Sequence, residues 1–278
     1  AMVGNGFGGQ GKYPSLVAGM SMDKPGHRIA ENAMAALERQ IQDPDSPRGA
    51  FIGDRAYIPG AKAEKLQIPL RQAGFSLVGD LREDSHGVKD NYEGAVQIDG
   101  SWYCPVVEML PGFVNPQAAL RLGEIDEERF DEIIEQRQVL ALRVKETRED
   151  GSQKFQCPAR GTSPTAVCPL VRNKKADGKA LFPIPKKMVP KKIDQGKVCT
   201  NKDSIIVPIE RGAKFAQQGP AWGTAEWKKA YQPPRATIES RNDLLKNARG
   251  AGIGDSTTRL VRGWAAQLFS VAIGVVAV

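Results

Sequence analysis

The stretch before residue 54 constrains the fold most, because it has the pattern of two strands joined by a helix. Leu16–Met22 and Ala50–Gly53 are short apolar runs of strand character. Between them, His27–Gln42 carries apolar residues at helical spacing, namely Ile29, Ala33, Met34, Leu37 and Ile41. Two parallel strands joined in this way need a right-handed crossover. With a further strand expected over Phe75–Gly79, the sequence predicts an α/β fold.

One helical stripe near the C-terminus holds an acid between two bases. Arg235, Glu239 and Lys246 fall on one face of a helix at about 100° per residue, with Asn242 between the last two. Such a stripe is also common on ordinary solvated helices, where the i,i+4 pair is a surface ion pair. A catalytic interpretation therefore needs a second acid elsewhere in the chain.

Asp54 supplies that second acid. It ends the expected strand Ala50–Gly53 and is followed by Arg55 and Tyr57. This segment resembles the second-aspartate motif of DDE-type insertion-sequence transposases, and the C-terminal stripe resembles their third-acid signature, Tyr-x2-Arg-x3-Glu-x6-Lys. Tyr231 stands one residue farther from the arginine than the signature has it. Other stretches similar to this family run from about Pro14 onward, among them Gln67–Phe75, Cys157-Pro, Cys168-Pro-Leu and Arg262–Gln267.

The resemblance implies an RNase H-like core, in which a mixed sheet is flanked by helices. Two Mg²⁺ or Mn²⁺ ions in such a core assist an in-line displacement at DNA phosphorus. Asp54 and Glu239 would be the catalytic metal ligands. Arg55, Arg235 and Lys246 would contact DNA phosphates.

The family's first aspartate lies on a strand ahead of the strand–helix–strand unit. The chain before Leu16 is glycine-rich and too short for two further strands. We therefore expect the C-terminal part of a longer transposase, or a decayed copy. Asp23 is the nearest substitute acid, but Asp23-Lys-Pro-Gly has the composition of a turn.

Three segments are expected: 1–83 as the first part of the core, 84–219 as a large insertion before the Glu239 helix, and 220–278 as helices that complete the core. The insertion opens with a hairpin over Ala95–Tyr103, whose Asp99-Gly100 pair suits a type I′ turn. An acidic helix is expected over Pro116–Arg137. The later part is basic, and we interpret it either as a solvated loop or as a surface for the DNA backbone; its lysines include Lys174, Lys175, Lys186, Lys187, Lys191 and Lys192.

All four cysteines, Cys104, Cys157, Cys168 and Cys199, lie in this insertion. Four thiolates can hold Zn²⁺ in a tetrahedral site and so order a polar segment. None of the spacings is the Cys-x2-Cys pair typical of zinc sites. Reduced, partly buried cysteines are therefore the competing interpretation. Disulfides are not expected, because the N-terminus lacks the pattern of a signal peptide.

Charge agrees with a nucleic-acid partner. The 278 residues carry a formal net charge of +7, and the isoelectric point is about 9.2. We expect a cytoplasmic, nucleoid-associated bacterial protein that forms a homo-oligomer on DNA. The apolar end Trp264–Val278 is shorter than a bilayer span, so we interpret it as a buried terminal helix and expect no membrane partner.

The expected activity is metal-dependent DNA strand cleavage and transfer at the ends of an insertion sequence. One alternative is a DNA-binding transposase remnant without catalysis, and another is a zinc-stabilised binding module. The glycine run Gly4–Gly9 follows no strand, which argues against a dinucleotide site. His27 and His86 are assigned surface or capping roles, since neither lies near a serine or cysteine in a nucleophile–base pattern.

Overall fold

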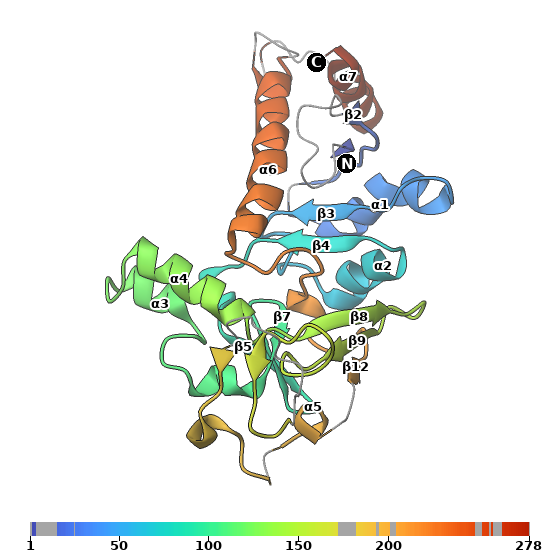
Figure 1. The fold of residues 1–278 in the computed structure, drawn as a ribbon. Coiled ribbons are helices and arrows are strands. Elements are labelled where there is room, and N and C mark those ends of the chain that lie inside the picture. The colour runs from blue at the N-terminus through green and yellow to red at the C-terminus, as the bar shows by residue number, and fades with distance from the viewer. Residues whose placement is uncertain are drawn as a thin grey trace.

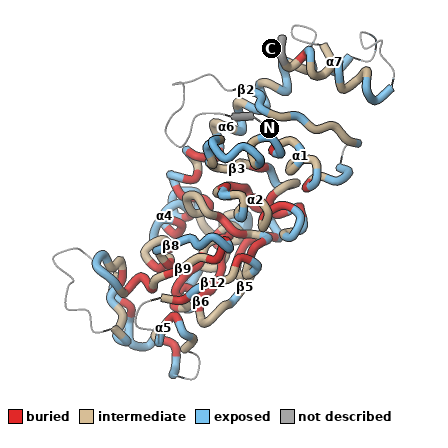
Figure 2. Tube along the Cα trace, turned by 90° about the vertical axis from the view of Figure 1, so that its right-hand side faces the viewer, coloured by how far each residue is buried: buried red, intermediate tan, exposed pale blue. Residues whose placement is uncertain are grey.

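The computed structural model describes residues 2–3, 16–24, 26–171, 182–192, 195–200, 204–247, 252–255, 257 and 263–277. Helices and short strands are mixed throughout this part of the chain, which confirms the α/β class (Figure 1). The strands form five small sheets among the described residues. Buried residues concentrate in the body around α2, β6 and β9 (Figure 2).

A parallel strand pair forms the centre of the N-terminal part. Strands β3 (Ala50–Gly53) and β4 (Ser76–Gly79) confirm two of the expected strands, and η1 (Ala63–Lys65) and α2 (Gln67–Gln72) connect them. Leu77 and Val78 are both fully buried on opposite faces of β4. Leu77 packs with side chains of α1 (Ile29–Gln42) and α2, and Val78 packs with Trp227 and Tyr231 of α6 (Ala225–Lys246), so helices cover both faces.

The first expected helix is confirmed, but the strand before it is largely wrong. Helix α1 covers Ile29–Gln42, whereas β2 is only Leu16–Val17 and pairs antiparallel with β1 (Met2–Val3) instead of joining β3. The reason lies at Gly19. A side chain there would meet the backbone oxygen of Ala36, so the chain runs directly over α1 rather than along a sheet.

Two glutamines cover the free edge of β4. The Leu77 carbonyl accepts from the Gln218 backbone N–H, and the Leu77 N–H donates to the Gln218 side chain, both at 3.0 Å. The Gln217 amide bonds both the N–H and the C=O of Gly79 at 3.1 Å. Unpaired edge groups of β4 are satisfied in this way. The end of the predicted insertion is thereby fixed to the predicted core.

The middle of the chain builds two antiparallel three-stranded sheets. Strands β5 (Val88–Tyr92), β6 (Ala95–Ile98) and β7 (Ser101–Tyr103) form one, and the other has the order β12 (Ile205–Val207), β9 (Gln153–Gln156), β8 (Arg143–Thr147). The hairpin prediction is confirmed, since Asp99 and Gly100 have φ of 47° and 83° as a type I′ turn requires. Shorter elements are η2 (Glu83–Ser85), η3 (Pro105–Met109), β10 (Ala166–Val167), β11 (Phe182–Pro183), η4 (Lys186–Met188), α5 (Lys197–Thr200) and η6 (Ala213–Phe215).

Three helices differ from expectation. The acidic helix is two helices, α3 (Pro116–Arg121) and α4 (Glu127–Gln138), because Gly123 between them has φ of 71°. Helix α6 (Ala225–Lys246) contains Glu239 but begins well before it. Helix α7 (Trp264–Ala277) is not buried as expected; its Trp264, Phe269 and Ile273 are 52%, 68% and 55% exposed, because the described part of the chain does not cover that face.

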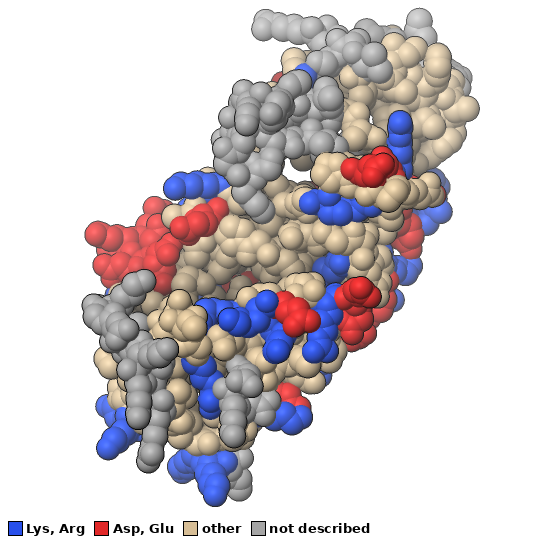
Figure 3. All heavy atoms as spheres, turned by 45° about the vertical axis from the view of Figure 1, so that its right-hand side comes forward, with Lys and Arg blue, Asp and Glu red and all other residues tan. Residues whose placement is uncertain are grey.

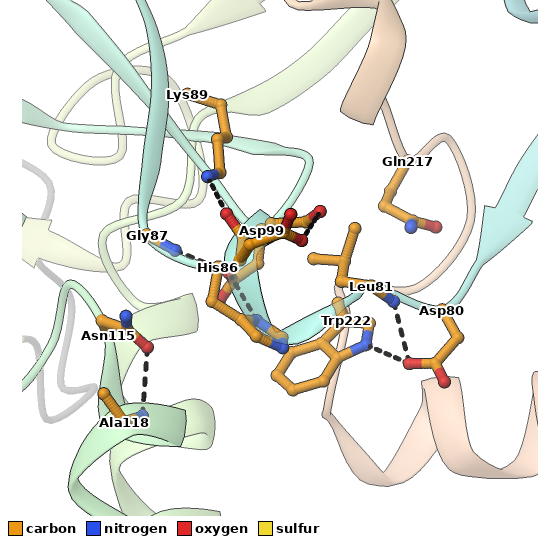
Figure 4. Close-up of polar contacts among 12 residues, drawn as sticks. Asp80, Leu81, His86, Gly87, Lys89, Asp99, Asn115, Ala118, Gln217 and Trp222 are labelled. Atoms are coloured by element: carbon orange, nitrogen blue, oxygen red, sulfur yellow. Dashed lines mark hydrogen bonds and ion pairs between the residues drawn. The ribbon is translucent and has the colours of Figure 1, made fainter. Parts of the chain in front are cut away.

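A buried ion pair connects the hairpin turn with α4. Arg137 and Asp99 are almost fully buried, and the guanidinium Nη2 lies 2.7 Å from Asp99 Oδ2. His86 Nδ1 lies 3.1 Å from Asp99 Oδ1, which also accepts the N–H of Gly87 (Figure 4). His86 is therefore buried, contrary to the expected surface role. Its ring packs 4.4 Å from that of Trp222.

We predict that Asp99→Asn destabilises the fold by about 3–5 kcal/mol, because it leaves the Arg137 charge buried without a counter-charge. Asparagine tolerates the left-handed backbone of this turn, so the loss reports on the ion pair. Urea unfolding would measure it. Glu132→Gln, which removes the exposed Arg129–Glu132 pair, is the control and should leave the midpoint nearly unchanged. Equal effects of the two changes would contradict a structural role for the buried pair.

The same carboxylate should make stability depend on pH. Burial alone would raise the pKa of Asp99, but the charge of Arg137 and the contact with His86 hold it below the ordinary 3.8. The stabilisation that Asp99 provides is thus fully present above about pH 4, and it is lost as the pH falls through the lower pKa that Asp99 has in the folded protein. Thermal unfolding followed below pH 4 should show a steeper decline for the wild type than for Asp99→Asn. Parallel curves would disprove this assignment.

Candidate functional site

Two aspartates directly follow the adjacent parallel strands β3 and β4, at the same edge of this sheet. Gly53 of β3 pairs with Gly79 of β4, so Asp54 and Asp80 follow at matching positions. Polar groups at the carboxyl ends of parallel strands are where α/β proteins commonly place their sites. Sequence reasoning missed Asp80. The signal was a repeated pattern, Phe-Ile-Gly-Asp at 51–54 and Leu-Val-Gly-Asp at 77–80.

Asp80 is buried and its carboxylate is saturated. Its Oδ2 accepts from Arg55 Nε and Nη2, each at 2.8 Å. Its Oδ1 accepts from the Leu81 N–H at 2.9 Å and from Trp222 Nε1 at 3.1 Å (Figure 4). A carboxylate with this many donors holds the surrounding elements in place and has little capacity left for a ligand.

Asp54 is exposed at the end of β3. Its Oδ1 accepts the Ala56 N–H at 2.8 Å, and its backbone carbonyl accepts from Tyr57 and Ile58. This turn holds the carboxylate at the end of the strand. Arg55 turns back to Asp80, yet its side chain remains 56% exposed, so its charge is available to an anion at the surface.

Side chains four residues apart form a row along one face of helix α6, beginning over the strand ends. We call this row the ladder; its members are Trp227, Tyr231, Arg235 and Glu239. Thr224 caps the helix by accepting the Trp227 N–H, and Trp227 Nε1 donates to the Gly79 carbonyl at 3.1 Å. The Trp227 and Tyr231 rings stack at 4.8 Å. Arg235 lies over the Tyr231 ring, 5.9 Å from its centroid. The ladder therefore leads from the buried strand end outward to solvent.

Tyr231 lies within electrostatic reach of both strand-end acids. Burial raises its pKa most, the Asp80 carboxylate adds to the increase, and Asp54 makes a smaller contribution. The tyrosine of the family signature is displaced by one residue in this sequence. The structure nevertheless packs Tyr231 against the β3–β4 sheet, within electrostatic reach of both acids.

Glu239 continues the ladder but does not join the strand-end acids. Its carboxylate is 63% exposed and pairs with Arg235 Nε at 2.9 Å. It lies two turns beyond Tyr231, about 12 Å along the helix axis. Within the described residues, no three or more His, Cys, Asp or Glu side chains are arranged to hold a metal ion. Lys246, in the last turn of α6, is exposed.

The Asp23 carboxylate stabilises the turn before α1 through its hydrogen bonds. It accepts from Lys24 N–H at 2.8 Å, from Arg28 Nε at 2.8 Å and from Asn32 Nδ2 at 3.3 Å, and His27 Nδ1 lies at 3.0 Å. The contact with His27, followed by the others, holds the pKa of Asp23 well below its ordinary value. This carboxylate organises the entry to α1.

The four cysteines, far apart in the sequence, line one small cavity. Cys104 follows β7, Cys157 follows β9, Cys168 follows β10, and Cys199 lies in α5. All four are free thiols around a volume of about 10 Å³. Burial raises the pKa of Cys104 and raises that of Cys199 to about 11, and in each case the neighbouring cysteines add to the increase.

The lysines assigned to DNA lie away from the strand-end acids. Lys186, Lys187, Lys191 and Lys192 are exposed around η4, at the opposite end of the molecule from α6 (Figure 1). On the face in Figure 3, basic side chains are frequent toward this lower end. Lys174 and Lys175 lie outside the described residues.

No protein-family model matches the chain, and neither a curated protein nor a solved structure matches it significantly. Among the helices of the described residues, none combines the length and apolar character needed to cross a bilayer.

We predict that substitutions at the two strand-end acids differ in their effect on stability. Asp80→Asn should lower the free energy of unfolding by about 1–3 kcal/mol, because Arg55 loses its counter-charge and a buried donor loses its acceptor. Asp54→Asn should change it little, since an amide oxygen can still accept the Ala56 N–H. Chemical unfolding of both variants tests this. A larger loss at Asp54 would show that its carboxylate is structural.

Proposed function

We propose that the chain belongs to a transposase of the DDE type, with Asp54 and Glu239 as its acids. The observation that carries this proposal is the exposed Asp54 carboxylate at the end of a parallel strand, with Tyr231 of α6 within its electrostatic reach and Arg235 and Glu239 following on the same helix face. This set contains the residue types of the family's second and third acid motifs.

In this proposal β3 and β4, with α1 and α6, are part of an RNase H-like core. The sheets β5–β7 and β8–β9–β12 are the cysteine-containing insertion. In the described residues β3 pairs on one side only, with β4. The other edge of β3 has the hydrogen-bonding groups to receive a strand that carries a further carboxylate.

The basic residues near the acids suit DNA phosphates. Arg55 and Arg235 are each about half exposed at the strand end and on α6, and Lys246 is exposed two turns beyond Glu239. Phosphate contacts of this kind position the duplex without reading its sequence. We place DNA, both transposon end and target, on this face and expect the chain to act there as a homo-oligomer.

Carboxylate oxygens suit Mg²⁺ or Mn²⁺, which would supply Lewis-acid assistance to displacement at phosphorus. Asp54 and Glu239 are the residues that would hold such an ion. Their present arrangement does not fit one, because Glu239 pairs with Arg235 and, within the described part of the chain, no third acid joins Asp54. We therefore derive no chemical step through a metal. This same observation favours the second candidate, a DNA-binding remnant without cleavage.

The test is Mn²⁺-dependent nicking of supercoiled plasmid. If the two acids act as the first candidate requires, the wild type nicks the plasmid and Asp54→Asn and Glu239→Gln fall to background, because each change removes one anionic oxygen that would hold Mn²⁺. Asp243→Asn is the matched control: Asp243 is an exposed acid one turn farther along α6, and its loss should leave nicking unchanged.

DNA affinity measured by fluorescence anisotropy separates the candidates. Nicking that persists in both variants would refute the assigned acids. Binding without nicking, with a salt slope near −0.9 per phosphate contact, would establish the remnant. Absence of both binding and nicking would exclude either DNA function.

A further inference from the structure

Four segments of the chain each contribute one cysteine thiol to the wall of the same cavity. The cysteines follow β7, β9 and β10 or lie in α5, and they meet around one cavity. Its volume of about 10 Å³ is close to that of a single small atom or ion. The remainder of its lining is apolar, including Val106, Leu170 and Val171. Among the described residues that line this cavity, side chains therefore offer an occupant only sulfur as a ligand atom.

The surrounding architecture has little regular structure to hold these segments. Strands β10 and β11 have two residues each, and α5 has four. The four thiols form no disulfide. Small, loop-rich segments of this kind are commonly stabilised by a metal ion bound to cysteines.

We propose that Cys104, Cys157, Cys168 and Cys199 form a structural Zn²⁺ site. Four thiolates satisfy the tetrahedral preference of zinc and leave no open position for substrate. The side chains as they stand do not yet form an arrangement that holds an ion. Each cysteine turns about a single Cα–Cβ bond, so zinc would draw the sulfurs inward and contract the cavity.

The site would also anchor the lysine-rich segment. Ile184 and Pro190 line the same cavity. Between and just after them lie four exposed lysines, Lys186, Lys187, Lys191 and Lys192. Zinc would thus fix a basic strap, residues 184–192, against the body. This inference is independent of the acids on β3 and α6, and it holds whether or not the chain cleaves DNA.

The first experiment measures metal content of the full chain purified without chelator. We expect one zinc per chain by mass spectrometry, and the visible absorption of tetrahedral, thiolate-bound Co²⁺ after exchange. Cys168→Ser and Cys199→Ser should each lower the zinc content. Val171→Ala alters the cavity wall without removing a ligand and should keep it. No zinc together with no such cobalt spectrum would overturn the proposal, and so would full zinc content in both cysteine variants.

The second experiment follows trypsin cleavage after the four strap lysines by mass spectrometry. Removal of zinc with a chelator should speed cleavage there about tenfold or more, and added Zn²⁺ should restore protection. The tryptic sites of α4, which lie outside the cavity, serve as the internal control. Unchanged cleavage of the strap would refute the anchoring role even if zinc is bound.

Discussion

The buried pair of Asp99 and Arg137 is the interaction on which the rest of this structure depends. It joins the tip of the β6–β7 hairpin to α4 by a direct contact of 2.7 Å between two buried side chains. Through His86 the same carboxylate reaches the Trp222 ring, and Trp222 donates to Asp80 at the end of β4. One continuous set of contacts therefore runs from the middle of the chain to the strand-end acids. A buried charge that is left unpaired is far more costly than an exposed one, so the loss of either partner would disturb the contacts that depend on this pair.

The repeated pattern at the ends of β3 and β4 shows that an aspartate in nearly the same local sequence can have two roles. Asp54 and Asp80 both follow a glycine that ends a strand. Only the surroundings differ: Asp80 lies beneath Trp222 and Arg55, whereas Asp54 faces solvent. Gly79 allows Ile58 to pack closely against the end of β4, because a Cβ there would lie 2.8 Å from the Ile58 side chain. Burial converts one acid into a structural anchor and leaves the other available to a ligand.

The cysteines illustrate the limit of reasoning from spacing. In sequence they are isolated, and no pair has the separation typical of a zinc ligand pair. Short strands and α5 bring them around one cavity, together with the lysine-rich segment. Polar and basic residues in this region add little to a hydrophobic core, so its order depends on a few buried contacts.

Periodicity and turn chemistry in the sequence determined α1, β3, β4, the Asp99-Gly100 hairpin and the helical face of Glu239, because those signals depend on neighbours within a few residues. The division of the acidic helix at Gly123 could also have been predicted from the local sequence. Other features needed the tertiary structure. Gly19 lets the chain cross α1, and α7 leaves its apolar face exposed. Asp80 is buried beneath Trp222, which is 142 positions away, and His86 is buried beside Asp99, which is 13 positions away. Burial and ion pairing are set by contacts distant in the chain, and a sequence pattern with a short period carries no information about them.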